Sequence, residues 1–146
     1  MINPMAFDIR HLATYLHLAR ASELRQRMLV RDRLLVIAGA MAHAAALPRI
    51  AAFCRGKILE HNPNHMVRRW ESFAAMADDA QFLPFLAQLQ RKYPAEKAEQ
   101  MLHSLGIELA NERDTYYSDE EYAASIWGVS LARLDELFPR SGGEGE

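Results

Sequence analysis

The sequence predicts an all-α, single-domain bundle of about six to eight helices. Three observations indicate this fold class. Apolar residues recur at helical spacing through most of the chain, and almost no segment shows the alternating pattern of a strand. Asn, Ser and Pro precede the apolar segments, and Gly follows several of them, as at helix boundaries. The 146 residues, half of them apolar and a quarter charged, suit one globular domain of common size.

The first two predicted helices form the centre of the bundle. Asn3 and Pro4 are expected to begin the first, and Ser22 is expected to cap the second. Residues 34–47 are apolar nearly all round, so we expect this part of the second helix to be the central helix. The inward residues of the two helices are predicted to be Leu12, Tyr15, Leu16, Ala19, Leu24, Met28, Leu35, Ala38 and Ala42, with Arg31 interrupting the seam.

Proline and glycine mark the middle elements. Pro48 is expected to begin a third helix, and Asn62–Pro63 another. The buried face of this fourth helix is predicted to carry Met66, Trp70, Phe73 and Ala77. Asp78 and Asp79 end it or cap the next helix, which Pro84 either kinks or begins.

The C-terminal half contains the clearest helix boundaries. Tyr93–Pro94 is expected to begin a helix that Gly106 ends in a left-handed conformation. Residues 108–117 are polar and predicted to be a linker. The next helix is expected to begin at the capping box Ser118–Glu121 and to end at Gly128, and a last short helix is expected to follow Ser130 and end at Pro139. We therefore predict one helical domain over residues 1–139 and a disordered tail over residues 140–146.

The segment EYAASIWGVSLARLDELF, residues 121–138, has a small residue at Ala124 and a turn glycine at Gly128. Val129, Leu134 and Leu137 follow at positions expected to be buried. The segment resembles the helix-turn-helix motif of bacterial repressors, over about 20 of the 146 residues. The resemblance implies a DNA-binding regulator that uses residues 119–138.

Charge argues against DNA binding by this segment. Its second helix offers Arg133 beside Asp135 and Glu136, and carboxylates there repel phosphates. A positive surface would have to come from the basic residues of the first half, which are otherwise interpreted as a solvated helix face. These residues are Arg25, Arg27, Arg31 and Arg33.

The two halves of the chain carry opposite charge. Residues 1–75 hold 11 Lys and Arg against 5 Asp and Glu, whereas residues 76–146 hold 6 against 14. Opposite fields of this size favour docking of the halves within one chain or contact between copies.

No residue pattern points to catalysis, a cofactor or a metal. His61 and His65 have the i, i+4 spacing of helical metal ligands, but Pro63 between them prevents both from lying on one helix face. Cys54 lies on an apolar face, where cysteines are usually inert. We therefore predict no catalytic residues, no cofactor and no bound metal.

The sequence therefore predicts a non-enzymatic helical protein-interaction module, with another protein or a second copy as its partner. The alternative is the DNA-binding regulator described above, and a small metal-dependent or ligand-binding protein around His61 and His65 ranks third. One cysteine rules out an internal disulfide, and the N-terminus lacks the features of a signal peptide, so we expect a cytoplasmic protein. The 14-residue apolar segment 34–47 is too short for a membrane span, which needs roughly 20 residues.

Overall fold

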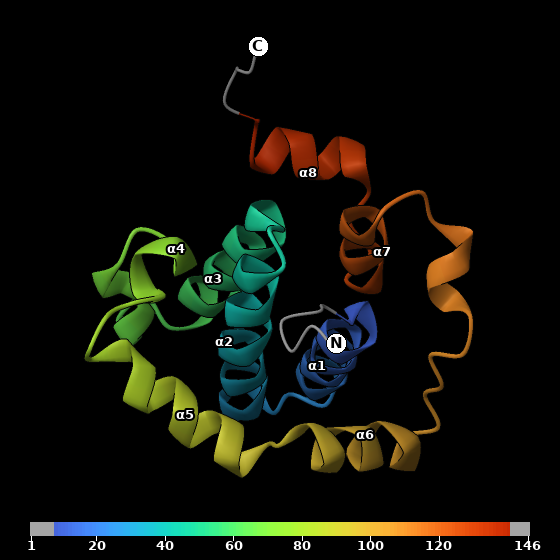
Figure 1. Ribbon diagram of the computed structural model, residues 1–146, viewed down its shortest axis with the longest axis horizontal. Coiled ribbons are helices and arrows are strands. Elements are labelled where there is room, and N and C mark those ends of the chain that lie inside the picture. The colour runs from blue at the N-terminus through green and yellow to red at the C-terminus, as the bar shows by residue number, and fades with distance from the viewer. Residues whose placement is uncertain (1–7, 141–146) are drawn as a thin grey trace, which may run out of the picture.

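The helix α2 (Met28–Ala44) runs through the middle of the bundle, and the other helices are arranged around it (Figure 1). The computed structural model describes residues 8–140. Within this range all regular structure is helical, with eight α-helices and two short 3-10 helices, which confirms the predicted fold class. The helix α1 (Ile9–Leu24) precedes α2. The elements that follow α2 in chain order are α3 (Pro48–His61), η1 (Met66–Arg69), α4 (Phe73–Met76), α5 (Phe82–Lys92), α6 (Ala95–Ser104), η2 (Glu112–Thr115), α7 (Asp119–Ile126) and α8 (Leu131–Leu137).

The central position of α2 follows from its composition. Its residues 34–39 are all buried, and α1 and α3 are its main neighbours. Gly39 is needed for close packing, because a Cβ atom there would overlap the ring of Phe73. The prediction of a central helix near residues 34–47 is confirmed, although α2 ends at Ala44 and Pro48 begins α3.

The first helix differs from the prediction at its end. Asp8 caps α1, since its side chain accepts a hydrogen bond from the Arg10 N–H at 2.9 Å; Asn3 and Pro4 lie outside the described residues. Ser22 does not start a new helix but lies inside α1. The break comes at Gln26, whose φ of 61° is left-handed, and the following Arg27 N–H donates to the Ser22 carbonyl at 2.8 Å. This is a Schellman ending without glycine, so the sequence gives no signal for it.

The prediction of one helix over residues 63–77 is wrong. Residues 66–69 form η1, Trp70 is extended, and Ser72 caps the separate short helix α4. Contacts from elsewhere in the chain hold the extended backbone: Arg55 Nε donates to the Trp70 carbonyl at 2.9 Å, and Trp70 Nε1 donates to Asp79 Oδ2 at 3.0 Å. The same Asp79 accepts the Phe82 N–H at the start of α5, and Pro84 lies within the first turn of that helix.

The predicted boundaries of the last three helices are confirmed. Gly106 ends α6 with a φ of 74°, and Gly128 ends α7 with a φ of 71°. The Ser118 and Ser130 side chains cap α7 and α8, each by accepting a backbone N–H at 3.1 Å. These ends form where the sequence signal is local, because cap and turn bonds join residues two to five positions apart.

Figure 1 shows α8 running across the end of the bundle above α2 and α7. Arg140, where the predicted tail begins, donates from Nη2 to Glu120 Oε1 at 2.9 Å, and residues 141–146 lie outside the described part of the chain. Across residues 8–140, no helix has both the length and the apolar content that crossing a bilayer would take.

Candidate functional site

The helix-turn-helix-like segment consists of α7, the turn at Gly128 and α8. Ala124 and Leu134 are buried as the resemblance implies, and Val129 is half-buried. Leu137 differs, because 41% of it is exposed, although the pattern placed it inside. Trp127 anchors the turn: its Nε1 donates to the Leu16 carbonyl of α1 at 3.1 Å. The first helix of the segment, α7, and the turn after it are therefore packed against α1.

The charged side chains of α8 form ion pairs within the protein. Arg133 Nη1 donates to Glu136 Oε1 at 2.8 Å on the exposed side of the helix. Asp135 pairs instead with the buried guanidinium of Arg49 at the start of α3. The helix that would enter a DNA groove thus presents one cation that is paired with its own neighbour, which agrees with the charge argument made from the sequence.

Arg49 lies at the centre of a cluster that joins α3, α7 and α8. Its Nε and Nη2 donate to the two carboxylate oxygens of Glu120 at 3.0 and 2.8 Å. The hydrogen bonds from Arg49 lower the pKa of Glu120, and the same bonds raise the pKa of Arg49. The cluster borders an open groove of about 870 Å³, but its charges neutralise one another. The cluster therefore holds α3, α7 and α8 together and leaves no unpaired charge for a ligand.

A second cluster ties together one end of α1, α2 and α3. Arg31, which the sequence suggested as part of an exposed basic surface, is 2% exposed. Its guanidinium donates to Asp32 Oδ1 at 2.9 Å, to Glu23 Oε1 at 2.5 Å and to the Lys57 carbonyl at 2.7 Å. These bonds fix the turn between α1 and α2, and Arg31 is not available to bind nucleic acid.

The same cluster includes one of the two candidate metal ligands. His61 ends α3, and its Nδ1 lies 2.6 Å from Asp32 Oδ2. His65 caps η1 by accepting the Val67 N–H at Nδ1, and burial is the main cause that lowers its pKa. Among the described residues, no three His, Cys, Asp or Glu side chains are grouped so that they could hold a metal ion. The metal-free state of the protein stays a prediction.

The lone thiol is buried in the hydrophobic core. Cys54 is fully buried in α3, and burial raises the pKa of its thiol to about 12. A nucleophilic cysteine needs the thiolate at neutral pH and an adjacent base. Cys54 therefore packs as a small apolar residue, as the sequence predicted.

One groove with a cationic rim lies between the end of α1, the start of α2 and α6. We call it the basic groove; its volume is about 420 Å³. Its floor is apolar, and three cations surround it: Arg25, Arg27 and Lys97. None of the described residues that line it is acidic. The lining residues are Leu18, Ala21, Ser22, Arg25, Arg27, Val30, Lys97, Gln100, Met101, Ser104 and Leu105.

Two large apolar side chains are exposed on the same turn as the groove. Leu24 is 72% exposed and Leu29 is 67% exposed, although the sequence placed Leu24 in a buried seam. They flank Arg25 and Arg27, and the Arg31 cluster holds this turn in place. The sequence had indicated a basic stretch here. It did not indicate the contribution of α6, which lies about 70 residues further along the chain.

Comparison with known proteins yields no significant match: no family model matches the chain, and no curated protein or solved structure is similar to it at a significant level. Its function must therefore be inferred from the chemistry of its own surface. The Arg49 and Arg31 clusters are satisfied internally. The basic groove, with an apolar floor and three cations that have no carboxylate partner in the described part of the chain, is the candidate binding site.

Proposed function

We propose that this protein is a non-enzymatic helical interaction module whose basic groove binds an acidic, amphipathic segment of a protein. The observation that carries the proposal is the combination of an apolar floor and an unpaired cationic rim in one groove. Small binding sites usually have volumes of about 300–1,000 Å³ and are mainly apolar with a few polar groups. The groove has this character.

The parts of the groove have complementary roles in such binding. Leu18, Val30, Met101 and Leu105 offer apolar surface, and the flexible Met101 can adapt to side chains of different shape. Arg25, Arg27 and Lys97 attract carboxylates and set the orientation of the bound segment. Leu24 and Leu29 extend the apolar contact beyond the groove onto the neighbouring turn. An acidic segment with one apolar face matches both the rim and the floor.

The non-enzymatic part of the proposal is supported by the state of the reactive groups. Cys54 is buried with a raised pKa. His61 and Arg49 are engaged with buried or half-buried carboxylates that hold helices together. A role as a binding module uses the surface features that these internal contacts leave free.

A DNA-binding regulator acting through residues 119–138 is the second proposal. The arrangement of α7, the Gly128 turn and α8 supports it, and the pairing of Arg133 with Glu136 weakens it. Titration against random duplexes at moderate salt, followed by selection from a random pool, tests it. Sequence-selective binding tighter than about micromolar and reduced by Arg133→Ala would favour this proposal, because non-specific binding alone is about 10⁻⁴–10⁻⁶ M.

The groove proposal is tested with a synthetic helical peptide that carries Leu on one face and Glu on the other, labelled for fluorescence anisotropy. The matched control peptide has Lys in place of Glu. We expect the Glu peptide to bind and the Lys peptide not to bind, with affinity falling as salt screens the charges. Arg27→Glu should weaken binding at least about tenfold, equivalent to about 1.4 kcal/mol.

Arg91→Glu is the control variant, because Arg91 is exposed on α5 and does not line the groove. It should leave the affinity for the Glu peptide within about twofold of that of the unchanged protein, a difference below about 0.5 kcal/mol. Absence of binding at low salt, or equal losses in Arg27→Glu and Arg91→Glu, would overturn the groove as the binding site. Thermal unfolding of both variants checks that they are folded.

A further inference from the structure

We infer that the segment bound by the basic groove is supplied by a second copy of this chain, as the acidic stretch over residues 112–121 with Tyr117 entering the groove. The inference rests on the proposed function and names its partner. In the inferred contact, Tyr117, the most exposed large apolar side chain among the described residues, enters the basic groove, whose cations have no carboxylate partner among those residues.

Tyr117 is presented in a fixed and open position. It lies between η2 and α7 and is 97% exposed, so its ring is almost uncovered by the described residues. Its backbone is held, because its N–H donates to Glu121 Oε1 at 2.8 Å. Next to it, Arg113 Nη1 donates to the Tyr116 carbonyl at 2.7 Å and Arg113 Nε to Asp119 Oδ1 at 2.6 Å. An exposed aromatic ring on a held backbone loses little freedom on binding.

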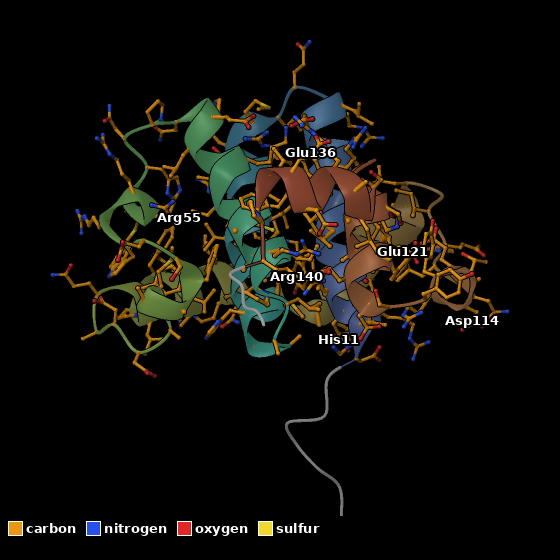
Figure 2. The ribbon with its side chains drawn as sticks, turned by 90° about the horizontal axis from the view of Figure 1, so that it is seen from above. His11, Arg55, Asp114, Glu121, Glu136 and Arg140 are labelled. Atoms are coloured by element: carbon orange, nitrogen blue, oxygen red, sulfur yellow. The ribbon has the colours of Figure 1, made fainter. Side chains whose placement is uncertain are left out.

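The charges beside Tyr117 complement those of the groove. Asp114 is exposed on η2, and Glu121 accepts the Tyr117 N–H; neither has a cation within ion-pair distance in the described part of the chain. Figure 2 shows Asp114 and Glu121 on the same side of the molecule, with Asp114 toward its edge. The nearby Asp119 and Glu120 are already paired with Arg113 and Arg49. Two carboxylates without a cationic partner among the described residues, Asp114 and Glu121, thus flank an exposed ring and are opposite in charge to the cations of the basic groove.

The segment cannot be assigned to the groove of its own chain. No residue of 112–121 lines that groove, which is formed by α6 and the junction of α1 and α2. The acidic stretch instead packs elsewhere, where Glu112 accepts from Tyr122 Oη at 2.8 Å and lies 3.2 Å from His17 Nε2. The contact therefore joins two different surfaces on two copies. Such a head-to-tail contact can repeat from copy to copy.

The inference is tested by mixing two variants that each lack one side of the contact. The groove variant carries Arg27→Glu and Lys97→Glu, and the segment variant carries Asp114→Lys and Tyr117→Ser. We expect the unchanged protein to form dimers and larger species as its concentration rises at low salt, measured by sedimentation velocity. Each variant alone should be a monomer. Their equimolar mixture should stop at a dimer, because one intact groove and one intact segment remain.

Leu83→Ser is the matched control, since Leu83 is 43% exposed on α5, away from both surfaces; it should assemble like the unchanged protein. A monomer at all concentrations of the unchanged protein at low salt would overturn the inference. So would assembly that survives in either variant alone, because the interface would then lie elsewhere. If the synthetic Glu peptide still binds the groove in those cases, the proposed function stands with another protein as partner.

Discussion

Arg49 and Glu120, 71 residues apart in the sequence, form a two-pronged ion pair in which Nε and Nη2 of the arginine reach both carboxylate oxygens. The arginine belongs to the basic half of the chain and the glutamate to the acidic half. Their side chains are 8% and 12% exposed, so the pair is largely shielded from water. The two oppositely charged halves are thus docked within one chain at this point, one of the two outcomes expected from the charge distribution.

Arg49→Met should lower the free energy of unfolding by about 3 kcal/mol, because it leaves Glu120 shielded from water without its main partner. Urea unfolding followed by circular dichroism measures this. Arg133→Ala removes an exposed arginine that pairs with Glu136 on α8, and it should change the stability by less than about 0.5 kcal/mol. Equal effects of the two substitutions would contradict a structural role for the Arg49 cluster.

The stability contributed by this pair should depend on pH. Arg49 holds the pKa of Glu120 below its ordinary value of 4.5, so the folded protein gains from the ionised carboxylate above that pH. The gain is lost as the pH falls through the lowered pKa. The difference in unfolding free energy between the unchanged protein and Arg49→Met should therefore be largest near pH 7 and shrink below pH 4.5. A difference that stays constant down to pH 3 would mean that Arg49 acts by packing alone.

Gly39→Ala should destabilise the protein by about 1–3 kcal/mol, the usual effect of overfilling a packed core. The added methyl group would overlap the Phe73 ring, which is buried against Phe82. The same change should cost less in a Phe73→Leu background. Gly56→Ala on α3 is the control: open space surrounds that position, and alanine in a helix should stabilise by about 0.5–1 kcal/mol. Thermal or urea unfolding distinguishes the opposite signs.

Ala46→Gly should stabilise the protein by about 0.5–1 kcal/mol. Ala46 has a φ of 60°, a left-handed conformation that costs a residue with a Cβ about 1–2 kcal/mol. Glycine removes this strain, but it also raises the conformational entropy of the unfolded chain, which lowers the stability by about 0.4–1 kcal/mol. Gly106→Ala is the reverse change at an equivalent helix end with open space around it, and it should destabilise. Equal signs for the two changes would contradict the strain at Ala46.

Helix boundaries could be predicted from the sequence where the signal is local. Pro48, Ser118, Ser130, Gly106 and Gly128 all stand where helices begin or end. The endings at Gln26 and Ala46 use the same hydrogen bonds, with Arg27 and Leu47 donating back to Ser22 and Ala42 at 2.8 Å. These two helix ends could not be predicted from the sequence, because nothing in the residue types Gln and Ala indicates a left-handed backbone. Packing of the flanking helices supplies the free energy that offsets its strain.

The helix predicted over residues 63–77 shows the opposite failure. Its apolar spacing fits a helix, yet Trp70 is extended and donates to Asp79, while its carbonyl accepts from Arg55. The spacing of apolar residues indicates which side chains can share a buried face, but it does not determine which backbone hydrogen bonds form. The Trp70 carbonyl is satisfied by Arg55 of α3 and its indole N–H by Asp79, and no local pattern in the sequence indicates such contacts.

By itself the sequence determined the all-helical class, the central apolar helix, the start of α3 and the ends of the last three helices, because these depend on spacing and on bonds between near neighbours. The tertiary structure decided which charges remain free. Arg31 belongs to the basic stretch that includes Arg27, but it is buried by Glu23 and Asp32, whereas Arg27 faces a groove completed by α6. Pairing of charges depends on which helices meet, and that meeting joins residues far apart in the chain.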